Sequence, residues 1–170
     1  TPKDTLAHLK TRQDNDPPHR IVEAVVAVND NRKRAMGRKV IQACGGDVRG
    51  KTIAVLGLTF KPNTDDMRDS PAIAVIQTLQ DAGATIRAYD PEGMEQAKLV
   101  LSDISYCANA YETMEGADAL VIVTEWDAFR ALDLARVKGL LKTPTLVDLR
   151  NIYPRDIVEA AGFDYTAVGR

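Results

Sequence analysis

The sequence predicts an α/β fold, in which a doubly wound and mostly parallel sheet of five or six strands follows a long central helix. Two patterns support this prediction. From Lys51 onward, short segments rich in Val, Ile, Leu and Ala alternate with segments of helical period. Before Lys51, apolar residues recur at helical spacing over residues 19–44. With 170 residues, 45% of them hydrophobic, the chain can close one core of ordinary size. The second part of the chain is therefore predicted to be Rossmann-like.

The first part of the chain is predicted to be helical. A helix over Thr1–Arg12 is interrupted by the prolines of Asp14–Pro18, and a long helix then runs from His19 to about Cys44 and ends at Gly45-Gly46. The middle of this helix, Asn29–Arg34, is polar on all sides. Such a helix bridges domains, pairs with another chain or is solvated there, and we favour the first two. We therefore assign residues 1–46 to a helical segment with a central dimerisation helix, and residues 47–170 to the domain that contains the sheet.

In the second part, strands and helices follow one another in turn, which indicates parallel strands joined by right-handed crossovers. The strand candidates are Thr52–Leu56, Thr85–Tyr89, Ala119–Val123 and Thr145–Val147, with weaker ones near Ile104–Tyr106 and Tyr165–Val168. The helix candidates between them are Ala72–Ala82, Pro91–Leu99, Ala110–Glu115 and Leu132–Leu140.

A dense polar loop follows the first strand, at the place where open α/β sheets bind ligands. Gly57 can turn sharply, and Ser70-Pro71 is a helix start with an N-cap and a proline in the first turn. No GxGxxG motif is present, so the pyrophosphate cradle of a dinucleotide-binding domain is absent. Lys61 and Arg68 could instead supply cations to a diphosphate. The acids of this loop either orient those cations or a ribose, or form a solvated turn in which they pair with Arg68 and cap the helix; they are Asp65, Asp66 and Asp69.

Polar or aromatic residues also follow three other strands. Asp90 is either a ribose ligand or the cap of the next helix. Trp126, in Thr124-Glu125-Trp126, either stacks on a base or packs under the loop, and we favour packing. Asp148 and Arg150 follow the next strand at the same edge. Four strand ends are thus predicted to face one crevice.

Composition excludes several classes of partner. The net charge is −2 and no run of Lys or Arg is present, which argues against nucleic acid or an anionic membrane. Two cysteines and two histidines, all isolated, predict no metal site and no disulfide. No apolar run reaches the ~18 residues of a membrane span, and no signal peptide opens the chain, so we expect a cytoplasmic protein.

The loop and the strand ends together resemble the nucleotide-sugar dehydrogenases, that is, the UDP-glucose/GDP-mannose dehydrogenase family. Residues 57–68 match the family signature GLxFKxxTxDxR, and Ser70-Pro71 continue it. Three further matches are Tyr89-Asp90-Pro91, Thr124-Glu125-Trp126 and Asp148-Leu149-Arg150-Asn151. Pro2-Lys3-Asp4 fit the last three places of the catalytic motif, whose cysteine would lie just before Thr1. The wording of the signature is most similar to the branch that acts on UDP-glucose.

The resemblance implies an architecture and a reaction. Members have an amino-terminal domain that binds NAD, a central helix that forms a homodimer, and a second Rossmann-like domain that binds the UDP-sugar. They oxidise C6 of the sugar twice, from UDP-glucose to UDP-glucuronate, through a thiohemiacetal and a thioester on the cysteine. This chain would hold the helix and the second domain, so we expect it to lack the NAD domain and the cysteine, and to be inactive on its own.

Roles for single residues follow from the same resemblance. Phe60, Lys61 and Arg150 would contact the nucleotide-sugar. Lys3 and Arg68 would lie near NAD, and Asp4 would position the catalytic water or tune proton transfer. Two alternatives stay open: a relative that acts on GDP-mannose or UDP-N-acetylmannosamine, and a non-enzymatic nucleotide-binding module such as a phospho-receiver.

Overall fold

Parallel strands form a single sheet in the computed structural model, which describes residues 31–169. The order of the six strands in this part of the chain is β3-β2-β1-β4-β5-β6, and every neighbouring pair is parallel. The chain thus winds outward in both directions from β1, which confirms the predicted doubly wound sheet and both weaker strands. The strands are β1 Thr52–Leu56, β2 Thr85–Tyr89, β3 Ile104–Tyr106, β4 Ala119–Ile122, β5 Thr145–Asp148 and β6 Asp164–Ala167.

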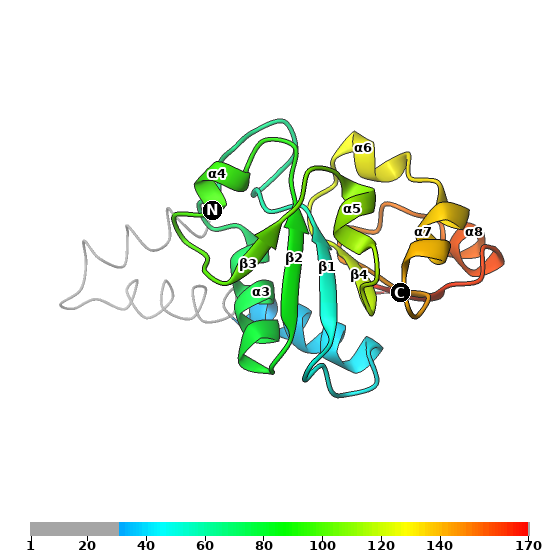
Figure 1. Ribbon diagram of the computed structural model, residues 1–170. Helices are drawn as coiled ribbons and strands as arrows, with labels where there is room; N and C mark the ends of the chain where they lie inside the picture. The colour runs from blue at the N-terminus through cyan, green and yellow to red at the C-terminus, as the bar shows by residue number, and fades with distance from the viewer. Residues whose placement is uncertain (1–30, 170) are drawn as a thin grey trace, which may run out of the picture.

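Helices cover both faces of this sheet (Figure 1). Alternate residues of β1 point to opposite layers, with Ile53 in one buried apolar cluster and Ala54 in the other. The first cluster contains side chains of residues 31–43, α3 and α4, and the second those of α5 to α8. Both faces of β1 are covered, which is why its apolar run is nearly continuous. Residues 31–43 are helical, followed by α3 Pro71–Asp81, α4 Met94–Ala97, α5 Ala110–Met114, α6 Asp127–Arg130, α7 Leu134–Leu140 and α8 Arg155–Ala160.

Two predicted helices need correction, and two short helices, α6 and α8, were not predicted. The predicted helix Pro91–Leu99 is only Met94–Ala97, because the Asp90 carboxylate accepts the amides of the first turn and holds that turn apart from the helix. The predicted start at Leu132 is also wrong. Asp133 caps α7 through the amides of Ala135 and Arg136, and a separate short helix, α6, precedes it. Helix α8 was not predicted, although Arg155–Ala160 carries a buried valine among polar residues.

The described part of the long helix packs on the sheet domain. Val40 is fully buried in the first cluster, and the helix ends as predicted at two glycines with positive φ. The Gly46 amide donates to the carbonyl of Ile41 at 2.9 Å, which satisfies a carbonyl of the last turn. The predicted start of this helix at His19 lies outside the described residues, and the domain boundary at residue 46 stays a prediction.

Gly37 sets how closely this helix approaches α3. A Cβ atom at Gly37 would lie 2.7 Å from Cβ of Thr78. We therefore expect Gly37→Ala to lower the free energy of unfolding by about 1–3 kcal/mol, because the two helices must separate. Urea unfolding measures this change. Gly139→Ala in α7 is the matched control, since nothing lies within 4 Å of its Cβ position, and equal effects of the two substitutions would contradict the close contact.

Candidate functional site

The strand order reverses between β1 and β4, and the predicted site residues follow the carboxyl ends of strands around this reversal. The structure joins them in two groups. Asp90 contacts the loop after β1 and also Trp126 after β4. Glu125 forms an ion pair with Arg150, which connects the loops after β4 and β5. The ends of four strands therefore contact one another, but the prediction that their polar residues face one crevice is not confirmed, because Asp90 is fully buried and Arg68 and Arg150 line different clefts.

Asp90 is fully buried and is surrounded by donors. Its Oδ1 accepts two amides of its own turn, and its Oδ2 accepts donors from two other loops. With no exposed surface and six protein donors, this carboxylate cannot reach a ribose. It does not cap α4 either, because the N-cap of α4 is Gly93; Asp90 holds the turn that precedes this helix. The donors are the amides of Glu92 (2.9 Å), Gly93 (2.8 Å), Leu58 (2.7 Å) and Thr59 (3.1 Å), the Thr59 hydroxyl (3.2 Å) and the Trp126 indole (3.2 Å).

Phe60 and Lys61 project from the loop that Asp90 holds. Leu58 and Thr59 are buried, whereas the Phe60 side chain is 38% exposed, unusual for an aromatic residue, and Lys61 is exposed. Lys61 makes no side-chain hydrogen bond or ion pair with any other described residue. An exposed aromatic ring and an ammonium group with no partner among the described residues thus follow directly after a buried stretch of backbone that Asp90 holds.

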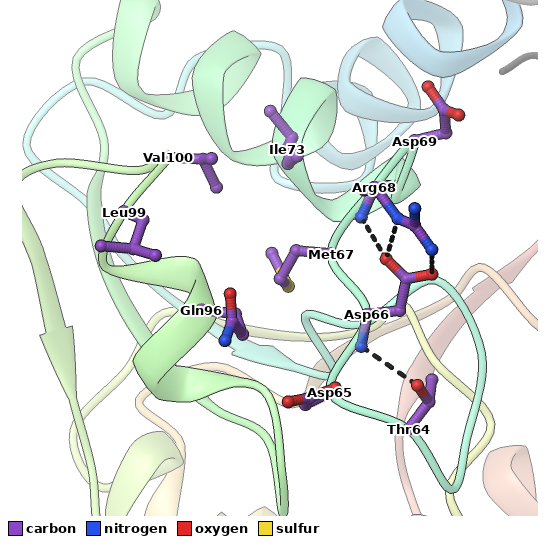
Figure 2. A pocket seen from close by; sticks show the side chains of 10 residues that line it. All are labelled: Thr64, Asp65, Asp66, Met67, Arg68, Asp69, Ile73, Gln96, Leu99 and Val100. Atoms are coloured by element: carbon purple, nitrogen blue, oxygen red, sulfur yellow. Dashed lines mark hydrogen bonds and ion pairs between the residues drawn. The ribbon is translucent and has the colours of Figure 1, made fainter.

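Arg68 is exposed and pairs with Asp66. Its Nε lies 3.0 Å from Oδ1 of Asp66 and its Nη2 lies 3.0 Å from Oδ2, a bidentate pair (Figure 2). This hydrogen-bonded carboxylate raises the pKa of the Arg68 guanidinium, so the side chain stays cationic. Asp66 therefore pairs with Arg68, which both interpretations of the loop acids allow. Ser70 rather than Asp69 caps α3, through the amide of Ala72.

A groove of about 570 Å³ separates this loop from α4 and the residues that follow it (Figure 2). Its floor is apolar, with Met67 and Ile73 on one side and Leu99 and Val100 on the other. Leu99 is 77% exposed. The loop side of the groove is charged and includes Asp65, Asp66, Arg68 and Asp69.

A second cleft, of about 580 Å³, lies between residues 31–43 and the loops after β5 and β6. Arg32, Lys39 and Arg150 line it, so it is basic. Arg32 and Lys39 were not identified as site residues from the sequence. The one signal that could have identified them is their spacing of seven residues, which places both on the same face of a helix. No described contact joins Arg150 to Phe60 or Lys61.

Asp148 is a second buried carboxylate with a structural role. It accepts the hydroxyl of Tyr165 at 2.8 Å and the amides of Tyr153 (3.0 Å) and Arg150 (3.2 Å). Burial raises the pKa of Tyr153 to about 12, so this phenol is neutral at physiological pH. The tyrosines hold Asp148 in place, and Asp148 in turn holds the backbone of Arg150.

Several sequence expectations meet limits in the structure. Lys3 and Asp4 lie outside the described residues. Within residues 31–169, no group of three or more His, Cys, Asp or Glu could hold a metal ion, and no helix has the length and apolar character to cross a membrane. Burial raises the pKa of the Cys44 thiol, which disfavours a reactive thiolate at this position. Cys107 is buried.

Comparisons with known proteins identify relatives over nearly the whole chain. Residues 54–155 match the UDP binding domain of the UDP-glucose/GDP-mannose dehydrogenase family. Over 169 residues the chain is 66% identical to the UDP-glucose 6-dehydrogenase of Rhizobium meliloti (strain 1021), covering 99% of this chain and 39% of that protein. It is 39% identical to the UDP-glucose 6-dehydrogenase TuaD of Bacillus subtilis (strain 168), covering 99% of this chain and 37% of that protein. A solved UDP-glucose dehydrogenase from Pyrobaculum islandicum superposes with a TM-score of 0.71 at 32% identity, covering 86% of this chain and 32% of that one. The chain thus spans about two fifths of the length of the curated relatives it matches.

Proposed function

This chain belongs to the UDP-glucose/GDP-mannose dehydrogenase family, and from that premise we propose that it is the UDP-sugar-binding portion of an NAD-dependent UDP-glucose 6-dehydrogenase. The complete protein would convert UDP-glucose to UDP-glucuronate in two oxidations. The part described here would bind and orient the nucleotide, whereas the cysteine chemistry and most of the NAD contacts would be supplied by other parts of the polypeptide.

The observation that carries this proposal is the presentation of Phe60 and Lys61. The Lys61 ammonium can pair with the diphosphate as a compact point charge with three donors. The exposed Phe60 ring gives an adjacent apolar surface for the sugar or the nucleoside. Because hydrogen bonds hold the backbone of the two residues before them, little backbone freedom would be lost when the ligand binds.

Arg68 would contribute a single contact to NAD. NAD carries a pyrophosphate, and the bidentate partner Asp66 leaves the exposed guanidinium cationic and oriented. The described residues contain no glycine-rich cradle for a dinucleotide, so the fit is that of one reaching side chain rather than a complete site. In the complete enzyme NAD would accept the hydride, and this chain's part would be to hold the phosphates.

The same proposal includes further residues and an assembly. Arg150, with Glu125 as its partner, would reach the substrate from the basic cleft. Lys3 would lie near NAD and Asp4 near the reacting carbon, both outside the described residues. A homodimer through the central helix and a cytoplasmic location complete the proposal.

Calorimetric titration of this chain tests the proposal directly. We expect UDP and UDP-glucose to bind, and uridine to bind at least about tenfold more weakly because it lacks the charged diphosphate. GDP-mannose is the matched competitor, and tighter binding of GDP-mannose than of UDP-glucose would favour the other branch of the family. No heat from UDP up to about 1 mM, the weak end of specific affinity, would overturn the assignment of this domain.

A further inference from the structure

We propose that Asp90 is a positioning residue for nucleotide binding, because it fixes the backbone of residues 58–61 in the shape that presents Phe60 and Lys61. This inference rests on the proposed function for the roles of those two side chains. In this role Asp90 neither contacts the nucleotide nor transfers a proton. It determines the conformation of the neighbouring loop.

The contacts of Asp90 divide between its two oxygens. Oδ1 accepts the amides of Glu92 and Gly93, which fixes the carboxylate on its own turn after β2. Oδ2 accepts the amides of Leu58 and Thr59 from the loop after β1. One fully buried side chain thus ties the end of β2 to the loop that carries the proposed binding pair.

The rest of the same loop backbone is held by side chains as well. The Ser70 hydroxyl donates to the Leu58 carbonyl at 2.6 Å, and the Thr124 hydroxyl donates to the Thr59 carbonyl at 2.8 Å. Both peptide groups of Leu58 and Thr59 are therefore satisfied by side chains instead of a neighbouring strand. We call Asp90, Ser70 and Thr124 the loop clamp.

The hydroxyl of Thr59 connects Asp90 of the loop clamp to the backbone of Lys61. Its oxygen lies 3.2 Å from Oδ2 of Asp90 and 3.0 Å from the Lys61 carbonyl. Both partners are acceptors, so its single proton is shared between them. The Phe60 amide in turn donates to the Asp66 carbonyl at 2.9 Å, which joins the clamp to the loop that carries Arg68.

An ionised carboxylate suits this position better than an amide does. All neighbours of Oδ1 and Oδ2 are donors, and a carboxylate is an acceptor at both oxygens. In Asp90→Asn, the amide nitrogen would point its hydrogens at N–H groups on one side or the other. The buried amides would lose their hydrogen-bond acceptor, and we expect the loop to move toward solvent, where water can accept those hydrogen bonds.

Amide hydrogen exchange and UDP titration of Asp90→Asn test the inference together. We expect the amides of Leu58 and Thr59 to exchange faster than in the wild type, and the affinity for UDP to fall about tenfold or more. Circular dichroism establishes that each variant is folded before either measurement. The control is Asp118→Asn, because Oδ2 of Asp118 accepts the Thr52 amide at 2.9 Å at the amino ends of β1 and β4, away from the loop clamp. This control is expected to leave both readouts at the wild-type values.

Each result has a defined meaning. Faster exchange with unchanged UDP affinity overturns the positioning role, as do equal effects of Asp118→Asn. If the wild type itself does not bind UDP, the proposed function fails. The role of Asp90 in holding the loop is then tested by hydrogen exchange alone, and unchanged protection of the Leu58 and Thr59 amides in Asp90→Asn overturns that role. If Asp90→Asn does not fold, Thr124→Val replaces it, with Thr124→Ser, which keeps the hydroxyl, expected to restore protection.

Discussion

Replacing Gly57 with alanine is expected to lower the free energy of unfolding by about 2–5 kcal/mol, a large part of the stability of an ordinary domain. Two costs combine at this position. The backbone has a φ of +97°, a conformation that residues with a Cβ rarely adopt. A Cβ atom would also lie 2.5 Å from the backbone nitrogen of Thr124, which cannot move without displacing the end of β4. Chemical denaturation followed by circular dichroism measures the loss.

Gly50→Ala separates the two costs. Gly50 has a φ of +74°, but nothing lies within 4 Å of its Cβ position. Its substitution should therefore show only the conformational cost, about 1–2 kcal/mol. If Gly57→Ala were no more destabilising than Gly50→Ala, the close approach of β1 and β4 at their carboxyl ends would be contradicted.

The sheet was predictable because local composition and period determine it. Strands buried on both faces have apolar runs, and β1 and β4 are such strands with every residue of β4 buried. The errors concern helix ends, where one side-chain hydrogen bond decides the outcome. Asp90 and Asp133 each accept nearby amides, and these contacts moved the starts of two helices.

The site was predictable only in part, for a reason that lies in strand register. The motif identified Lys61 and Arg68, and the structure places both as exposed cations after β1. The role of Asp90 depends on the pairing of Leu56 with Tyr89, which brings the residue after β2 against the loop after β1. No local sequence pattern contains that register. For Trp126, 8% exposed and bonded to Asp90, the favoured packing interpretation agrees with the structure.

Lys61→Ala is expected to reduce the affinity for UDP by about 10- to 100-fold, the range for loss of one hydrogen bond to a charged group. The same substitution should leave stability almost unchanged, because the Lys61 side chain is exposed and bonded to no described residue. Calorimetry of UDP binding, combined with denaturant unfolding, separates the two effects. Since the contact is ionic, the wild-type affinity should also fall with added salt more steeply than that of the variant.

Lys142→Ala is the matched control for this measurement, since Lys142 is exposed and lies before the amino end of β5, whereas Lys61 follows the carboxyl end of β1. Removing it changes the net charge by the same amount, so a general electrostatic effect would appear in both variants, and a specific contact only in Lys61→Ala. Lys61→Arg keeps the charge on a planar group of different shape, and should retain part of the affinity. Equal UDP affinities for the wild type and Lys61→Ala would show that Lys61 does not contact the diphosphate. They would favour binding in the basic cleft that Arg32, Lys39 and Arg150 line.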